Sequence, residues 1–219
     1  FIIAFLTLFG CEKEVNNPKY IAIKTTLKTP SLNYHWDIKK KYLDQSISHN
    51  WIKETYKNNK VPYIELHQIK NISTEAFLNE FLDHIYDEEL NQLVRAAKQT
   101  NYPVIVNFLP LTQYPSISAS QYKETYDYII KYCNHKGAGN IFWVFEGLIN
   151  DIKKTETYFP GKDKIKWMIL NTEDKNLNLN TIQNIVDREN ENLPHNFILD
   201  KSIISLFKSN NELSSYLKN

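Results

Sequence analysis

Four acidic residues stand at or near the ends of apolar runs, which is where α/β folds keep reactive groups. They are Glu65 after VPYI, Glu146 after NIFWVF, Glu173 after WMIL and one polar stretch, and Asp200 after FIL. If these runs are parallel strands, their carboxyl ends meet at one edge, where two carboxylates can act as general acid and base. We single out Glu146, because an aromatic run precedes it. The alternative is that each acid is solvated or pairs with a lysine.

These acids can meet only if one sheet positions the runs before them. Periodicity predicts strands at 20–26, 32–36, 61–66, 103–109, 140–146, 164–170 and 196–200. It predicts helices at 47–58, from Ser73 onward, and at 87–99, 118–135, 179–190 and 203–217. Strands that alternate with helices and are apolar throughout are typical of a parallel sheet covered by helices. Six or seven strands fit either an open doubly wound sheet or a (β/α) barrel.

Other chemistries find little support in the residues. Cys133 has helical spacing with Tyr126, Ile129 and Ile130, so we expect a packed thiol rather than a nucleophile. No CxxC or HExxH pattern occurs, so we expect no metal. No glycine-rich turn follows a strand, which excludes the dinucleotide and P-loop patterns, and we expect no cofactor. His67 is either a loop histidine or part of the site.

Length and charge leave the broad class open. The 219 residues suffice for one large domain, which we place at residues 20–219. A formal net charge of +1 gives no argument for a nucleic-acid partner. We expect a monomer.

The first eleven residues, FIIAFLTLFGC, are apolar up to Cys11 and are followed by Glu-Lys-Glu. The run is too short to span a bilayer, which takes about 20 residues. It resembles the end of a bacterial lipoprotein signal, in which Cys11 is lipidated and residues 12–19 form a tether. This predicts a protein anchored to the outer membrane, facing the periplasm or the cell surface. The alternative is a buried N-terminal strand.

Several motifs between about residues 60 and 175 occur in a recognisable order. They are Tyr86-Asp87, Pro103-Val104, Gly137-Ala138-Gly139-Asn140-Ile141, Trp143, Tyr158-Phe159-Pro160-Gly161-Lys162-Asp163 and Trp167. In this order the segment resembles glycoside hydrolase family 26, the family of the β-mannanases. The resemblance implies a (β/α)8 TIM barrel, with fewer than eight strands as a possibility left open. It also implies a polysaccharide or oligosaccharide as the partner.

The sequence departs from the family where the chemistry should lie. The family strand matching Pro103–Phe108 runs into His-Glu-x-Asn, and the Glu is the general acid/base. Here the Glu position is Leu111, and the Arg that usually ends the strand is Asn107. A retaining glycosidase needs two carboxylates, one of which protonates the leaving oxygen, and leucine cannot do so. The nucleophile has only a weak match, Asp200.

Aromatic residues near the expected strand ends offer flat faces on which sugar rings stack. The candidates are Trp143, Tyr158, Trp36 and Tyr114. The alternative for each is packing in the core or at the rim.

Three hypotheses follow. The first is an envelope lipoprotein with a glycosidase-like barrel that has lost its acid/base and binds polysaccharide. The second is an active glycosidase whose carboxylate pair is drawn from Glu65, Glu146, Glu173 and Asp200. The third is a scaffold lipoprotein that uses the barrel as a protein-binding surface.

Overall fold

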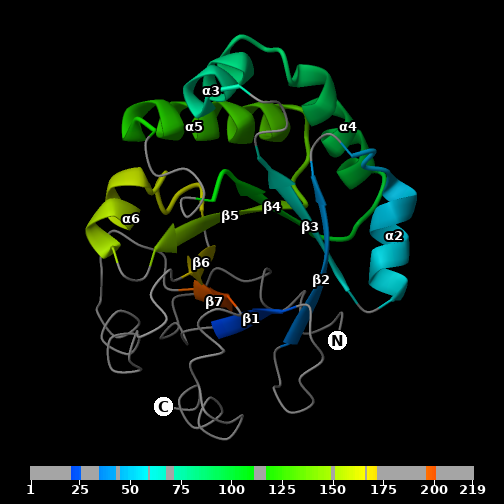
Figure 1. The fold of residues 1–219 in the computed structure, drawn as a ribbon. Coiled ribbons are helices and arrows are strands. Elements are labelled where there is room, and N and C mark those ends of the chain that lie inside the picture. The colour runs from blue at the N-terminus through cyan, green and yellow to red at the C-terminus, as the bar shows by residue number, and fades with distance from the viewer. Residues whose placement is uncertain are drawn as a thin grey trace, which may run out of the picture.

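Seven parallel strands close into a barrel in the part of the chain that the computed structural model describes. It describes residues 21–25, 35–42, 45–58, 60–67, 72–110, 117–148, 151–165, 167–171 and 196–200. The strands are β1 (Ile21–Thr25), β2 (His35–Tyr42), β3 (Val61–Leu66), β4 (Val104–Phe108), β5 (Ile141–Leu148), β6 (Trp167–Asn171) and β7 (Asn196–Asp200). Each pairs with the next, and β1 pairs with β7, so the sheet has no edge (Figure 1). The predicted barrel class is confirmed.

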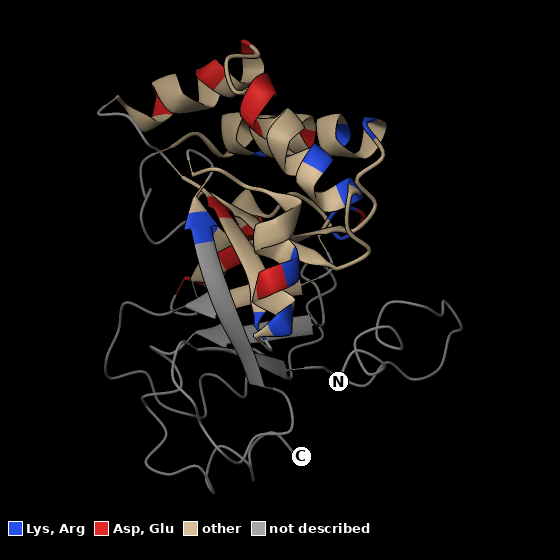
Figure 2. Ribbon diagram, turned by 90° about the vertical axis from the view of Figure 1, so that its right-hand side faces the viewer, with Lys and Arg blue, Asp and Glu red and all other residues tan. Residues whose placement is uncertain are grey.

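Helices cover the outside of β2 to β5, as Figure 1 shows. They are α2 (His49–Lys57), α3 (Thr74–Leu82), α4 (Asp87–Lys98), α5 (Ala119–His135) and α6 (Ile152–Tyr158). Serine hydroxyls cap three of them: Ser48, Ser73 and Ser118 each accept a hydrogen bond from a first-turn N–H. Helix α4 carries acidic residues in its first turn and basic residues in its last, which suits the helix dipole (Figure 2).

Most strand predictions are confirmed, and the exceptions have simple causes. The strand expected at 32–36 is misplaced, because the described strand β2 runs from His35 to Tyr42 through three consecutive lysines that hide its apolar pattern. Strand β6 starts at Trp167 rather than at residue 164, because Ile165 N–H donates to Gly161 O at 3.0 Å and closes a turn. Gly161 has φ +121°, as its place in a turn predicts. The short helix α6 was not predicted, and the helices expected at 179–190 and 203–217 lie outside the described residues.

Two apolar clusters follow from the alternation of side chains along the strands. The larger cluster fills the space between the barrel and the helices and includes Leu66, Phe108 and Phe145. The smaller cluster lies inside the barrel and is made by Tyr63, Ile105, Val144, Trp167 and Ile169. We call this second group the barrel floor. No helix among the described residues is long and apolar enough to cross a membrane.

Candidate functional site

Three buried polar residues face the barrel interior beyond the barrel floor. Glu65 is two residues after Tyr63, Asn107 is two after Ile105, and Glu146 is two after Val144, so alternation turns all three inward. Their exposed fractions are 3%, 0% and 3%. They lie toward the carboxyl ends of β3, β4 and β5, the end at which barrels of this type carry their sites. We call Glu65, Asn107 and Glu146 the polar layer.

Asn107 connects the two acidic strands of this layer. Its amide Nδ2 donates a hydrogen bond to Glu146 Oε2 at 3.2 Å. In the sheet register Asn107 pairs with Glu65 on one side and with Val144 on the other. Glu146 therefore stands two residues higher on β5 than the direct partner of Asn107, and the stagger of the barrel lets the amide reach it diagonally.

The amide oxygen of Asn107, unlike its nitrogen, has no hydrogen-bond partner among the described residues. This oxygen, Oδ1, is buried. A buried amide oxygen is usually paired with protein or water, so this atom is an acceptor whose hydrogen bond the described residues do not supply.

Tyr63 lies below the polar layer and responds to both acids. Burial raises the pKa of its hydroxyl well above the usual value, and the carboxylates of Glu146 and Glu65 raise it further. The hydroxyl therefore stays protonated and uncharged. The same electrostatic coupling places both carboxylates in the surroundings of one phenol.

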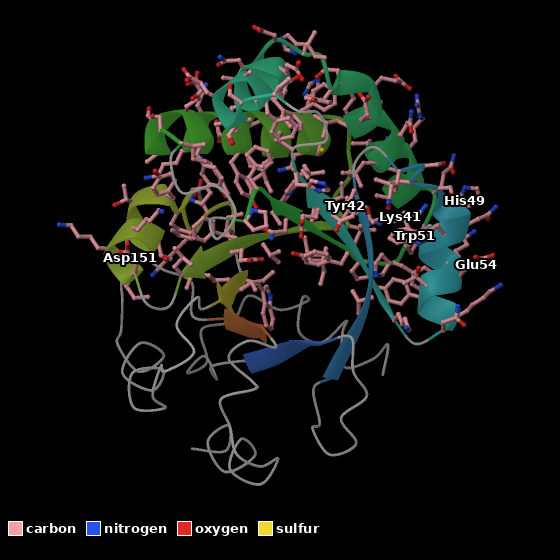
Figure 3. The ribbon with its side chains drawn as sticks, viewed as in Figure 1. Lys41, Tyr42, His49, Trp51, Glu54 and Asp151 are labelled. Carbon is pink, nitrogen blue, oxygen red and sulfur yellow. The ribbon has the colours of Figure 1, made fainter. Side chains whose placement is uncertain are left out.

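The polar layer reaches the rim of the barrel through His67. Its Nδ1 lies 3.9 Å from Glu65 Oε1, and its side chain is 23% exposed. Tyr42, at the end of β2, packs edge-on against the imidazole with ring centroids 4.1 Å apart. Figure 3 shows Tyr42 at the end of β2, with Lys41 and Trp51 close by on the α2 side. Glu65, His67 and Tyr42 thus form a path from the polar layer to the surface.

Hydroxyl groups from α5 fix the strand ends beside the polar layer. Tyr122 donates to Phe108 O at 2.9 Å, and Tyr126 donates to Val144 O at 2.6 Å. Leu109, directly after β4, has φ +39°, a left-handed conformation that is unfavourable for leucine. The bonds from Tyr122 hold the chain in place at this strained residue, two positions before Leu111 in the sequence.

Two of the aromatic residues predicted to stack on sugar rings lie outside the barrel, unlike Glu65 and Glu146. Trp143 faces the helices, is 6% exposed and packs against Tyr126 with centroids 6.2 Å apart. Tyr158 lies in α6, where its hydroxyl donates to Ile117 O and its ring packs edge-on against Tyr122. Both side chains therefore pack outside the barrel, away from the polar layer. Trp36 belongs to β2 and pairs with Lys24, and Tyr114 lies outside the described residues.

The structure does not describe the side chains of the other two predicted acids, Asp200 and Glu173. Asp200 ends β7 and pairs in register with Lys24 of β1. Glu173, Leu111 and Cys11 lie outside the described residues. Among the candidates whose side chains the structure describes, Glu65 and Glu146 both lie in the polar layer.

Two residues of the site escaped prediction from the sequence. Tyr63 and Tyr42 are tyrosines in strands, a common position for this residue type. The only signal in the sequence is that Tyr63 precedes Glu65 by two residues, which places those two side chains on the same face of β3. Cys133 is fully buried, and burial raises the pKa of its thiol to about 12, which fits the predicted packing role. Among the described residues, no group of three or more His, Cys, Asp or Glu is placed to hold a metal ion.

No protein-family model and no curated protein matches the sequence. Solved structures do match the fold. A family 26 β-mannanase from Bacteroides ovatus aligns with 78% of this chain and 70% of its own, at a TM-score of 0.52 and 10% identity. The family 26 protein GH26C from a Muricauda species aligns with 78% and 69%, at 0.52 and 8%. GH26A from the same genus aligns with 78% and 77%, at 0.50 and 10%.

The fold is similar to that of solved glycoside hydrolase family 26 structures. The resemblance drawn from the order of motifs is therefore confirmed at the level of the fold. Identities of 8 to 10% place the chain far from these family 26 proteins in sequence. The chain therefore shares the barrel fold of these proteins, with a divergent sequence.

Proposed function

We propose that this chain is a carbohydrate-binding barrel of the cell envelope that has lost the acid/base of family 26. It binds a polysaccharide or oligosaccharide at the carboxyl end of the barrel, acts as a monomer and is held at the outer membrane by lipid on Cys11. The observation that carries the proposal is the polar layer. Its two carboxylates are 3% exposed, and an asparagine stands between them in place of the family's arginine.

The chemistry of the polar layer favours binding over hydrolysis. A glycosidase needs a carboxylic acid that can reach and protonate the leaving oxygen. The family position for that acid is Leu111, and the carboxylate of Glu146 already accepts a hydrogen bond from the amide of Asn107. A carboxylate held in this way remains a hydrogen-bond acceptor, the role that sugar hydroxyl groups require of it.

A second candidate function is hydrolysis by a relocated pair. The inward placement of Glu65 and Glu146, on the strands that flank β4, favours it. Two carboxylates on either side of a substrate could divide the roles of acid and nucleophile.

Replacement of Glu146 by glutamine separates the two candidates. We expect the unmodified protein to bind mannan or a related polysaccharide in affinity electrophoresis and to release no reducing ends from it. Glu146→Gln should weaken binding about tenfold, because a carboxylate acceptor for sugar hydroxyls becomes a neutral amide. Glu124→Gln, an exposed position on α5, is the matched control.

Release of reducing ends that disappears in both Glu65→Gln and Glu146→Gln would instead establish the relocated pair. A protein that binds none of a panel of neutral, acidic and amino polysaccharides would favour the scaffold hypothesis.

The lipid anchor is tested separately. In the full-length protein expressed in a Gram-negative host, Cys11→Ser should move the protein from the outer-membrane fraction to the soluble fraction, because a lipidated cysteine is the proposed attachment. Incorporation of labelled palmitate should be lost in the same variant. Cys133→Ser controls for the loss of a thiol, and unchanged fractionation of Cys11→Ser would reject the anchor.

A further inference from the structure

Glu146 lies on the part of β5 that pairs with β6 and no longer with β4. The pairing of β4 with β5 ends at Asn107 and Val144, whereas the pairing of β5 with β6 continues to Leu148. Beyond Val144, β5 therefore has β6 as its ladder partner and no longer β4. The backbone that carries Glu146 needs another support to hold its place.

A threonine of α6 supplies that support. The hydroxyl of Thr155 donates to Leu148 O at 2.9 Å and accepts from Leu148 N–H at 2.8 Å. Thr155 is fully buried and Leu148 is 5% exposed, so water does not compete for these two bonds. One side chain thus satisfies both backbone groups of a residue two positions after Glu146.

Helix α6 lies so close to β5 at Thr155 that residue 147 of the strand must be glycine. A Cβ on Gly147 would lie 2.5 Å from Thr155 Cγ2 and 3.4 Å from Met168 Sδ. Glycine at this position lets α6 approach the strand until the threonine can reach Leu148. Gly147 directly follows Glu146, so the strand is held immediately beside the carboxylate.

Helix α6 is itself anchored at both ends. Asp151 caps its start by accepting from Lys154 N–H at 2.9 Å, and Figure 3 shows Asp151 at this end of the helix. Past its other end, Phe159 packs edge-on against Phe145 with centroids 5.5 Å apart. The support therefore brackets Glu146, with contacts on the residue before it and on the two residues after it.

We propose that Thr155 is a positioning residue, which through Leu148 and Gly147 holds Glu146 where Asn107 can donate to it. This rests on the proposed function in one respect, that the polar layer is the part that binds carbohydrate. The placement of Glu146 against Asn107 is a separate consequence and can be measured without a ligand.

The test compares two buried threonines with the same substitution. Thr155→Val keeps the shape and removes both bonds to Leu148. Thr125→Val is the matched control, because Thr125 is also fully buried and its hydroxyl donates to Gln121 O at 2.9 Å, within α5. Thr155→Ser keeps the hydroxyl and should restore the behaviour of the unmodified protein.

The first readout is the side-chain amide of Asn107 in a ¹H–¹⁵N spectrum, assigned through Asn107→Asp. We expect Glu146→Gln and Thr155→Val to shift this signal in the same direction, and Thr125→Val and Thr155→Ser to leave it in place. A merely structural loss of stability would not move the signal, since spectra are taken far below the unfolding temperature. If Thr155→Val leaves the signal unchanged, the proposal is overturned.

The second readout is the affinity for mannohexaose, measured by calorimetry. We expect Thr155→Val to bind about tenfold more weakly, the equivalent of one hydrogen bond, and Thr125→Val to bind normally. If no variant and no unmodified protein binds mannohexaose while the Asn107 signal responds as expected, the positioning role stands and the use of mannan is rejected. Equal weakening in Thr155→Val and Thr125→Val would overturn the proposal.

A milder variant covers the case in which Thr155→Val does not fold. Asp151→Ala removes the cap of α6 and should shift the Asn107 signal by a smaller amount in the same direction. No shift in Asp151→Ala, with the cap lost, would also count against the proposal.

Discussion

Replacing Gly147 by alanine should lower the free energy of unfolding by about 2–3 kcal/mol, because the new methyl group overlaps a buried side chain. Its Cβ would lie 2.5 Å from Thr155 Cγ2 and 3.1 Å from Thr155 Oγ1. Neither atom can retreat easily, since Thr155 is held by two hydrogen bonds to Leu148. For a chain of this size the loss corresponds to a fall of roughly 5–10 °C in the unfolding temperature.

The clash is specific to one methyl group, which gives the prediction a strong internal check. Thr155→Ser removes Cγ2 and keeps the hydroxyl, so the double variant with Gly147→Ala should recover more than half of the lost stability. Gly139→Ala is the control, because a Cβ there would meet nothing within 4 Å. Thermal unfolding followed by circular dichroism measures the four variants and the unmodified protein. A double variant that is as unstable as the sum of its single variants would show that the methyl overlap is not the cause.

The barrel could be predicted from the sequence because the described side chains of β3, β4 and β5 are mostly buried on both faces. VPYIEL and VIVNF read as strands from composition alone, since every residue but one is buried in the first and all are buried in the second. The same rule failed for β2, where Lys39, Lys40 and Lys41 interrupt the apolar pattern. It also missed α6, because a helix of seven residues spans barely two turns and leaves no periodic stripe to detect.

The site was predictable in part, for a different reason. Position at the end of an apolar run identified Glu65 and Glu146, and the structure turns both inward. Which aromatic residues face the same space depends on register, and a shift of one residue reverses the face. Trp143 directly precedes the inward-facing Val144 on β5, so its side chain points to the opposite face and packs against Tyr126 of α5. Asn107 and Glu146, whose carboxylate accepts from the Asn107 amide, are 39 residues apart in the chain, and no local pattern reveals that contact.

Asn140 should be the second position of large effect, through the side-chain amide that ends the Gly-Ala-Gly-Asn motif. Its Nδ2 lies 2.9 Å from Ala97 O, 3.2 Å from Thr100 O and 2.8 Å from Tyr102 O, and so holds the connection between α4 and β4. Asn140→Ala removes the amide that joins these three carbonyl groups and should cost about 2–3 kcal/mol. Asn134→Ala, at an exposed position near the end of α5, is expected to be nearly neutral.

Asn140→Asp should cost more than Asn140→Ala at neutral pH, although it changes the shape least. The introduced carboxylate cannot donate and would face three carbonyl oxygens, so its protonated form is favoured in the folded protein. The pKa of that carboxyl is then raised on folding, so the extra cost is full above the folded pKa, declines as the pH falls through it, and is gone near the unfolded value of about 4. Chemical denaturation of both variants between pH 7 and pH 3.5 measures the difference directly. If Asn140→Asp were as stable as the unmodified protein at pH 7, the amide would not be the donor that holds this connection, and the motif would owe its role to the glycines alone.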